Sequence, residues 1–547
     1  MRKMSSATAA PLAVLCWTIG AAVFFRTSLL SRFATINGDA ADGQLIMYMH
    51  EHLFRWLQGQ ASFGSPAVFY PQPDVLGYTD AFLLDLLPYS AISLLGADPY
   101  LGMQLLGIAL TALCFFCTFH IFARQLGVRT TIALAAALLV TFPNNLFFKL
   151  SGAHINFFDI YYIPLIVMLT LAALKSFPLA NARSLALTAI AAALYGLLFA
   201  TSYYVAWLLA FCVLIAAVFA AIKFRTDMLD FVRENRRALI TYLGVAALGF
   251  ALGIIPFLKV YLPVLTVHPA RDFREYIGHA PFLYDVINVS GTNAIWGGLV
   301  TLILGAPRAA APELALAVTP IMGTLFIAWA FARRNRFELA GSRTRAIIVS
   351  SCAAVAVLSW LLTIKIGTFS AFWIPFHVIP GGSAIRAAER IQLLCSGFVV
   401  AGLVLLLDAW LDEASAREVT RRQLAVAAIL VVCLAEQLNF YRDGFDRAAA
   451  LTALAAVPAP PRGCEVIVVA NAGQRPLQTD AMWISLTVGL PTINGDSSWL
   501  PPGWHLNDRD HDYFAEAGDW IAYSHLTKPV CLYDQATRAW SPFSPVT

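Results

Sequence analysis

Charged residues are scarce in this chain. Only 13% of its 547 residues are Asp, Glu, Lys or Arg, whereas 59% are hydrophobic, and the mean hydropathy is +0.68. Soluble proteins have about a quarter of their residues charged, so an ordinary soluble globule is excluded. The net charge of +4 is small. The sequence has no basic patch with interleaved aromatic residues and no zinc-ligand spacing, so a nucleic-acid partner is not expected.

A convincing signal-peptide cleavage site is also missing. Arg2 and Lys3 precede an apolar run at 11–30, but no small-residue cleavage motif follows it. The run is long enough to stay as a membrane anchor. We therefore expect an all-α polytopic membrane protein whose first span is retained.

Eleven apolar segments approach the roughly 20 residues that a spanning helix needs. They are residues 11–30, 100–123, 130–148, 158–174, 184–201, 203–222, 238–262, 313–331, 346–364, 391–411 and 424–438. The run 81–95 is apolar but too short to span, so we expect it to lie on the membrane surface.

The basic residues of the loops agree with this count. With a cytoplasmic N-terminus, every inner loop is basic, as the positive-inside rule requires. These residues are Arg124, Arg129, Lys175, Arg183, Lys223, Arg225, Arg233, Arg236, Arg237, Arg333, Arg334, Arg336, Arg343, Arg345, Arg417, Arg421 and Arg422. A full span at 81–95 would put the clusters around Arg236 and Arg334 outside.

This topology predicts a membrane domain at 1–438, with outer segments 31–99 and 263–312, and an outer tail at 439–547. The tail has fewer long apolar runs and many Asp, Asn, Pro and Trp residues. Expected strands at 465–470 and 529–533 and a helix at 479–488 indicate a small extracytoplasmic α/β domain.

The tail contains two cysteines, Cys464 and Cys531, one beside each expected strand. The compartment permits oxidation, so we predict a disulfide between them. The alternative is a pair of buried thiols.

Two carboxylates, Asp39 and Asp42, lie in the first outer loop. Acids near a membrane surface are candidates for function. Either could deprotonate a hydroxyl group, and Asp39 could also hold a divalent cation such as Mg²⁺ or Mn²⁺. The alternative for Asp39 is that it caps an amphipathic helix at 44–57.

Several stretches together resemble the GT-C superfamily of membrane glycosyltransferases. They are NGDAADGQ at 37–44, FYPQPDVLGYTDAFLLDLLPYSAISLLGADP at 69–99, RQLGVR at 124–129, GAHINFFDIYYIPL at 152–165 and GGSAIRAAERIQLL at 381–394. The soluble C-terminal domain fits the same plan.

This resemblance implies an enzyme of the bacterial-type cytoplasmic membrane. It would transfer a sugar from a polyprenyl-phosphate carrier to a glycan, lipid or protein acceptor at the outer face. The acidic residue that such enzymes use as a base or metal ligand would be Asp39. The first outer loop lacks a clear Asp-Xaa-Asp or Asp-Glu pair, so metal dependence stays open.

Other residues are candidates for substrate binding or catalysis. Arg386 and Arg390, four residues apart, would share one helix face and suit a phosphate group. The alternative is neutralisation by Glu389, Asp408 or lipid headgroups. His154 could bind phosphate or sugar, or be structural. Asp80 is a second candidate acid, or the N-cap of the short helix at 81–95.

Two further features have plainer interpretations. His50, Glu51 and His52 are adjacent in sequence but point to different helix faces, so a shared metal is not expected. The loop 491–499 carries Asn and Trp residues of the kind that bind sugars, although the same residues stabilise turns.

Two other functions remain alternatives: a transporter or flippase of lipid-linked saccharide, and a non-catalytic assembly factor for envelope polysaccharide. A transporter is disfavoured because the sequence shows no series of intramembrane acids and no inverted repeat of broken helices.

Overall fold

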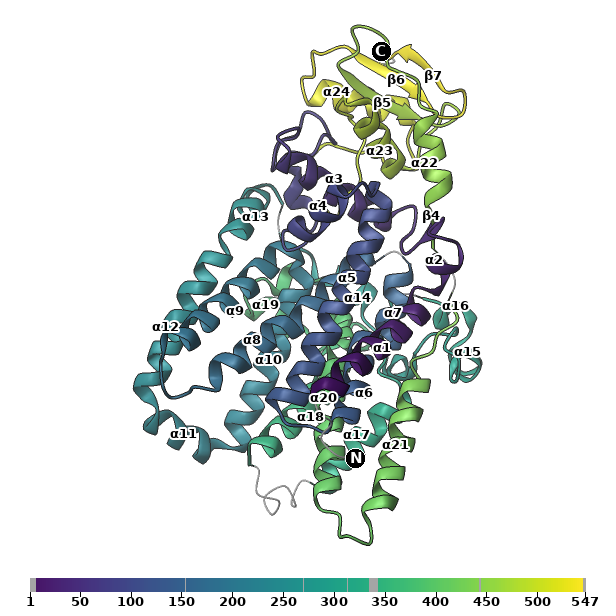
Figure 1. The fold of residues 1–547 in the computed structure, drawn as a ribbon. Coiled ribbons are helices and arrows are strands. Elements are labelled where there is room, and N and C mark those ends of the chain that lie inside the picture. Colours follow the sequence, from purple (N-terminus) through teal and green to yellow (C-terminus); the bar gives the residue numbers. More distant parts are fainter. Residues whose placement is uncertain are drawn as a thin grey trace.

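The computed structural model describes residues 6–152, 154–268, 270–311, 313–333, 343–441 and 444–544. It is a long helical bundle with a small globular C-terminal domain at one end (Figure 1). Arg2, Lys3, Arg334 and Arg336, four of the basic residues used to predict topology, lie outside the described residues.

Within the described residues, eight helical stretches are long and apolar enough to cross a membrane. They are Pro99–Gln125, Thr130–Leu150, Ile155–Leu174, Ala182–Thr201, Tyr203–Lys223, Arg236–Gly253, Arg343–Thr363 and Ala388–Asp412. The other three expected spans correspond to α1 (Ser6–Phe24), α17 (Pro320–Arg333) and α21 (Val419–Ala435), which are not among these eight stretches.

The long stretches contain the main helices of the bundle. These are α5 (Pro99–His120), followed by a π-turn Ile121–Gln125, α6 (Thr130–Thr141), α7 (Asn144–Ser151), η3 (Ile155–Tyr162), α8 (Ile163–Leu174), α9 (Ala182–Thr201), α10 (Tyr203–Lys223), α12 (Arg236–Gly253), α18 (Arg343–Thr363), η6 (Ala388–Arg390) and α20 (Ile391–Asp412). α13 (Ile255–Val267) follows α12 directly.

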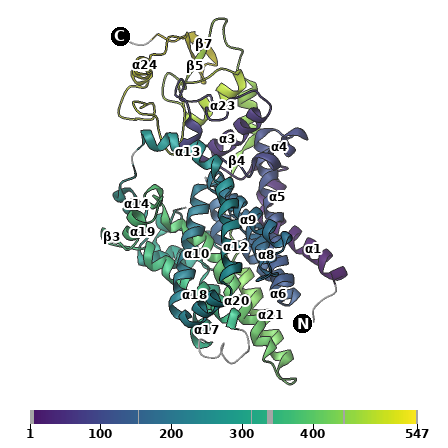
Figure 2. The same cartoon turned by 90° about the vertical axis from the view of Figure 1, so that its left-hand side faces the viewer.

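Short elements join these helices. They are α2 (Arg26–Leu30), β1 (Thr35–Ile36), α3 (Asp42–Leu57), η1 (Val75–Tyr78), α4 (Leu86–Leu94), α11 (Arg225–Glu234), α14 (Phe273–His279), η4 (Leu283–Ile287), α15 (Gly297–Leu304), α16 (Ala306–Ala309), β2 (Lys365–Ile366), β3 (Phe369–Ser370), α19 (Trp373–Val378) and η5 (Gly382–Ala384). The short apolar run forms α4, which has only 9 residues. α14 and α19 lie together on one side of the bundle (Figure 2), where Phe273 packs on Phe376.

The C-terminal domain has the predicted α/β character. Its sheet has the order β5 (Val466–Ala470), β6 (Val530–Asp534), β7 (Ala539–Pro542), with β5 parallel to β6 and β7 antiparallel. Its helices are α22 (Arg447–Ala455), α23 (Gln478–Val488) and α24 (Tyr513–Tyr523). The predicted disulfide between Cys464 and Cys531 is present.

The C-terminal domain docks on the first loop. β1 pairs in antiparallel fashion with β4 (Phe445–Asp446), and Trp483 Nε1 donates to the Gln44 carbonyl at 3.2 Å. Arg447 forms an ion pair with Asp98. The Asp39 loop and the C-terminal domain therefore lie at the same end of the bundle, whereas α11 lies at the other end (Figure 1).

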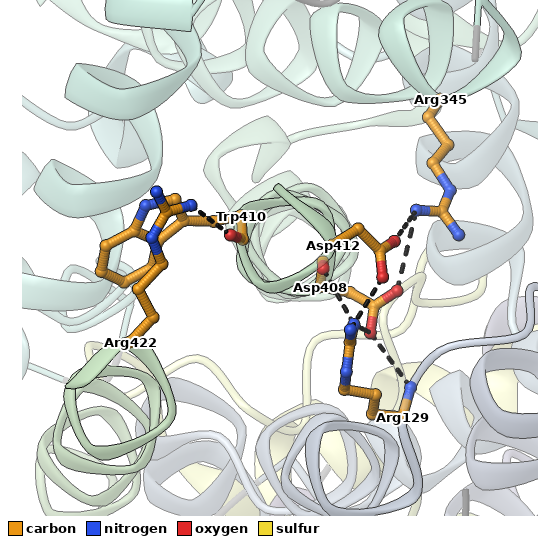
Figure 3. A network of polar contacts seen from close by, with 6 residues as sticks. All are labelled: Arg129, Arg345, Asp408, Trp410, Asp412 and Arg422. Atoms are coloured by element: carbon orange, nitrogen blue, oxygen red, sulfur yellow. Dashed lines mark hydrogen bonds and ion pairs between the residues drawn. The ribbon is translucent and has the colours of Figure 1, made fainter. Parts of the chain in front are cut away.

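That other end is held together by an ion-pair network (Figure 3). Arg129 bonds Asp408 at 2.8 Å and Asp412 at 2.7 Å, and Arg345 approaches Asp412 at 3.5 Å. Asp408 therefore neutralises Arg129, and it is not the partner of Arg386 or Arg390.

α9 and α12 pack closely through small residues. Gly249 and Gly253 of α12 are four residues apart, and a Cβ at either would collide with the backbone of α9 at Ala189 or Ala193. Small residues at this spacing allow helices to approach in a membrane, where lipid provides no hydrophobic force between them. This contact fixes one wall of the larger cavity described below.

We expect Gly253→Val to destabilise the protein, because the added side chain must separate α12 from α9, at a cost on the order of 1 to 3 kcal/mol. Thermal unfolding of the detergent-purified protein measures the effect as a lower Tm. The matched control is Gly244→Val on the same helix, where no atom lies within 4 Å of the added Cβ. Equal melting temperatures for the two variants would contradict the prediction.

Candidate active site

Two cavities lie at the end of the bundle that carries the C-terminal domain. Cavity 1, about 680 Å³, is lined by the Asp39 loop, the end of α7, α22 and the C-terminal domain. Cavity 2, about 880 Å³, is lined by α3, α9, α10, α12, α13 and the segment before α20. His154 lines both cavities, so the two cavities meet at this side chain.

Cavity 2 has a polar and an apolar part. Five of the six residues predicted to be catalytic or substrate-binding line it, and its polar side chains include Asp42, Asp80, His154, Arg271, Arg386, Arg390 and Asp496. Its apolar side chains include several from α9, α12, α13 and the junction of α12 with α13: Phe199, Phe250, Ile254, Phe257, Val264 and Leu265. The fold thus brings together residues that are far apart in the sequence.

Glu313, which no sequence pattern indicated, contacts three charged or titratable side chains of the site. Its carboxylate contacts Lys149 Nζ at 3.0 Å, His154 Nε2 at 2.6 Å and the Arg390 guanidinium at 2.9 Å. Burial alone would raise the pKa of Glu313, but Arg390, Lys149 and the His154 hydrogen bond together hold this pKa well below its usual value. Glu313 is therefore ionised.

His154 bridges Glu313 and the first loop. Its Nδ1 lies 3.7 Å from Asp42 Oδ2. Burial lowers the pKa of His154, the hydrogen bond with Glu313 opposes this effect, and the charges of Lys149 and Arg390 add to the lowering. Together they bring the pKa of His154 to about 4. The imidazole is therefore neutral near neutral pH.

The two first-loop acids have different surroundings. Asp39 Oδ1 accepts the backbone N–H of Ala41 at 3.1 Å and of Gly43 at 2.7 Å, at the start of α3. Gly43 belongs to the first turn of α3, whose N-cap position is Ala41, so Asp39 supports the start of the helix from outside the cap position. Asp39 lines cavity 1. Asp42 instead faces cavity 2 with its side chain 54% exposed. Burial and the charge of Asp39 raise the pKa of Asp42. The catalytic role predicted for Asp39 stays a prediction.

Asp80 accepts hydrogen bonds from the turn between α9 and α10. Its carboxylate accepts from the Tyr203 N–H at 3.0 Å, from Asn156 at 3.3 Å and from Ser202 at 3.4 Å. Asp80 therefore does not cap α4, for which the capping position is Asp85. Burial raises the pKa of Asp80, against the three hydrogen bonds that lower it.

The expectation that Arg386 and Arg390 share a helix face is wrong, because α20 begins only at Ile391. Both still line cavity 2. Arg390 is 10% exposed and paired with Glu313, whereas Arg386 is 37% exposed and lies 3.7 Å from Glu275. Arg390 is thus a fixed charge, and Arg386 is the more accessible guanidinium.

The C-terminal domain also reaches cavity 2, through the loop 491–499. Asp496 and Trp499 line the cavity. The Arg271 guanidinium lies over the Trp499 ring, 4.2 Å from its centroid, and the backbone N–H of Trp499 donates to the Tyr78 carbonyl at 3.2 Å. Burial, then the charges of Asp42 and Asp39, raise the pKa of Asp496 to about 6. The Asn and Trp residues make this loop a candidate from the sequence, but no local pattern marks Asp496.

Metal ligands are not grouped in the part of the chain that the structure describes. No set of three or more His, Cys, Asp or Glu residues there is arranged to hold a metal ion. His50, Glu51 and His52 contact separate partners, respectively Asp85, Arg55 and the Phe63 carbonyl. The metal role considered for Asp39 stays a prediction.

No protein-family model matches the sequence, and no curated protein matches it. The structure is similar to the crystal structure of the Archaeoglobus fulgidus oligosaccharyltransferase in the apo form, with a TM-score of 0.52 and 12% identity over 96% of this chain and 69% of that chain.

Two further solved structures are similar. AglB from Archaeoglobus fulgidus, in complex with an inhibitory peptide and a dolichol-phosphate, matches with a TM-score of 0.51 and 12% identity over 96% of this chain and 69% of that chain. The mycobacterial arabinofuranosyltransferase AftD matches with a TM-score of 0.49 and 15% identity over 90% of this chain and 32% of that chain. The likeness to the two oligosaccharyltransferase structures confirms the expected resemblance at the level of fold: this chain has the fold of the Archaeoglobus fulgidus oligosaccharyltransferase.

Proposed function

We propose that this protein is a membrane glycosyltransferase that takes a sugar from a polyprenyl-phosphate carrier and transfers it to a hydroxyl group of an acceptor. The observation that carries the proposal is the composition of cavity 2. Its polar part includes the guanidinium groups of Arg386 and Arg390 and the carboxylate of Asp42, and it adjoins an apolar part formed by membrane helices. A lipid-linked sugar phosphate has the same division into charged and apolar parts.

The donor phosphate fits the two arginines. Guanidinium groups bind phosphate oxygens through paired N–H donors. Arg390 supplies a charge held in place by Glu313, and Arg386 is accessible enough to contact the phosphate directly.

The prenyl chain fits the apolar side of cavity 2, where α12 and α13 form the wall. The outer faces of these helices expose large apolar side chains such as Leu252, Leu262 and Leu265, as expected where helices meet lipid. A carrier lipid could therefore reach the cavity from the bilayer. AglB from Archaeoglobus fulgidus, which shares the fold, binds a dolichol-phosphate in its complex.

The acceptor is assigned to cavity 1. Its lining offers the aromatic faces of Tyr100 and Trp483, together with the polar groups of Asp480, Gln535 and Arg538. Aromatic rings and polar side chains of this kind suit a hydroxyl-bearing substrate. An acceptor in cavity 1 and a donor in cavity 2 would meet at His154.

Asp42 is placed to act on the reacting sugar. In glycosyl transfer the anomeric carbon gains positive charge in the transition state. A carboxylate in the same cavity as the two arginines stabilises that charge while the arginines stabilise the departing phosphate.

The reaction is assigned to the outer face of the membrane. Both cavities lie at the end that carries the disulfide-bonded domain, and α11 lies at the opposite end, within a segment 223–237 that has more basic than acidic residues. Basic loops favour the cytoplasm, and disulfides persist in oxidising compartments.

We expect Asp42→Asn to lower turnover by about 10²- to 10³-fold, because the amide cannot stabilise positive charge. Turnover is measured as the release of lipid phosphate when purified protein is incubated with polyprenyl-phosphate glucose, mannose or arabinose. A flippase would move such lipids without cleaving them. Asp39→Asn is the matched comparison, since its amide oxygen can still accept the Ala41 and Gly43 N–H groups, so most activity should remain unless Asp39 itself acts on the substrates. Loss in Asp39→Asn with retention in Asp42→Asn would make Asp39 the reacting acid.

A labelling experiment tests the orientation. We expect a membrane-impermeant thiol reagent applied to intact spheroplasts to label Ala536→Cys in the C-terminal domain and not Glu234→Cys in α11. Both positions are exposed. The reverse pattern would place the site on the cytoplasmic side.

We expect Asp496→Asn to stabilise the protein at about pH 8 and to have little effect below about pH 4. The folded-state pKa of Asp496 is raised to about 6, so the unfolded state ionises first and the free energy of unfolding falls as pH rises through this range. At about pH 8, removing the charge should raise the free energy of unfolding by on the order of 2 kcal/mol. Melting curves at several pH values measure it, and an equal Tm difference at every pH would contradict the assignment.

A further inference from the structure

His154 has a position that points to a further role, which rests on the proposed function. Among the described residues that line the two cavities, His154 is the side chain they share. With the donor in cavity 2 and the acceptor in cavity 1, a group that acts on the acceptor hydroxyl must lie where they meet. His154 occupies that position.

The hydrogen bond to Glu313 decides which nitrogen of His154 carries the proton. Nε2 lies 2.6 Å from Glu313 Oε1, and an ionised carboxylate can only accept. Nε2 is therefore the protonated nitrogen of the neutral ring, and Nδ1 has the free lone pair. This is the orienting relation that a buried carboxylate has with a catalytic histidine in hydrolases.

The lone pair of Nδ1 is available to a substrate. Its distance to Asp42 Oδ2 is 3.7 Å, beyond the range of a normal hydrogen bond. A hydroxyl group placed beside Nδ1 could therefore donate to it.

Four charged groups surround the ring of His154. Glu313 and Asp42 favour the protonated ring, whereas Lys149 and Arg390 disfavour it. Lys149 and Arg390 are themselves held by Glu313. The balance leaves the imidazole neutral at neutral pH, which is the form that can accept a proton.

We propose that His154 is the general base of the transfer reaction and that Glu313 is its positioning residue. The acceptor O–H gives its proton to Nδ1 as the oxygen forms a bond to the anomeric carbon. The bond between that carbon and the phosphate oxygen breaks, and the phosphate departs with the bonding electron pair on its lipid. The imidazolium is held by Glu313 until it returns the proton to water.

The test uses the full-length protein in detergent or nanodiscs with the donors that support turnover. His154→Gln, which keeps polarity but has no comparable base, should lower kcat by about 10²- to 10³-fold and leave the donor KM within about threefold. His154→Ala should lose activity in the same way and recover it on addition of imidazole. The recovery should increase as pH rises through about 6 to 7, because only neutral imidazole accepts a proton. A merely structural histidine would not be replaced by a free base.

His377→Ala is the matched control, since His377 is exposed on α19 and lines neither cavity among the described residues. It should keep its activity and show no response to imidazole. Glu313→Gln should lower kcat when His154 is present and change kcat little in the His154→Gln background, because the two act as one unit. Glu313→Gln should also change the donor KM, because Glu313 holds Arg390 in place. This change in KM should be seen both with His154 present and in the His154→Gln variant.

The outcomes separate this inference from the proposed function. If the wild type transfers sugar while folded His154→Gln keeps more than about a third of the turnover, the base assignment is wrong and the function stands. Absence of imidazole recovery in a folded His154→Ala variant also overturns the assignment. If the wild type releases lipid phosphate from none of the donors, the proposed function and this inference both fall.

Discussion

The site depends on the charge of one half-buried carboxylate. Glu313 contacts Lys149, His154 and Arg390, which come from α7, the loop after it and the segment before α20. An unpaired buried charge is costly, and removing one partner of a buried pair commonly costs 3 to 5 kcal/mol. The three elements are thus held together by a single ion, which also sets the tautomer of His154 and the place of Arg390.

The two cavities exist because the C-terminal domain is docked on the first loop. β1 and β4 form a small sheet between the two parts, and Trp483 bonds the backbone of α3. The same domain delivers Asp496 to cavity 2. A soluble domain that supplies walls to both cavities is therefore part of the site, and its separation from the bundle would open both.

The carboxylates of cavity 2 are arranged for function at some expense of stability. Asp39 raises the pKa of Asp42, and Asp42 and Asp39 raise the pKa of Asp496, which means that these ionised carboxylates repel one another. Natural proteins keep such repulsion at sites where a ligand or a developing positive charge relieves it.

The sequence by itself determined the architecture and most of the candidate residues. Apolar segments of about 20 residues specify spanning helices because the bilayer leaves backbone groups no other partner. The strand patterns and the position of the cysteines specified the C-terminal domain, and the disulfide follows from them. Asp42, Asp80, His154, Arg386 and Arg390 were singled out by chemistry and do line one cavity.

The tertiary structure alone decided how these residues work together. Glu313 stands at the edge of an apolar segment, and nothing in its neighbourhood marks it as the partner of His154, which is 159 residues away, or of Arg390, which is 77 residues away. Asp496 reaches the cavity only because its loop crosses to the membrane domain. Local patterns fix helices and strands, because those depend on neighbours in sequence. Charge pairing, tautomers and cavity walls depend on contacts between distant segments, so they are fixed only when the chain has folded.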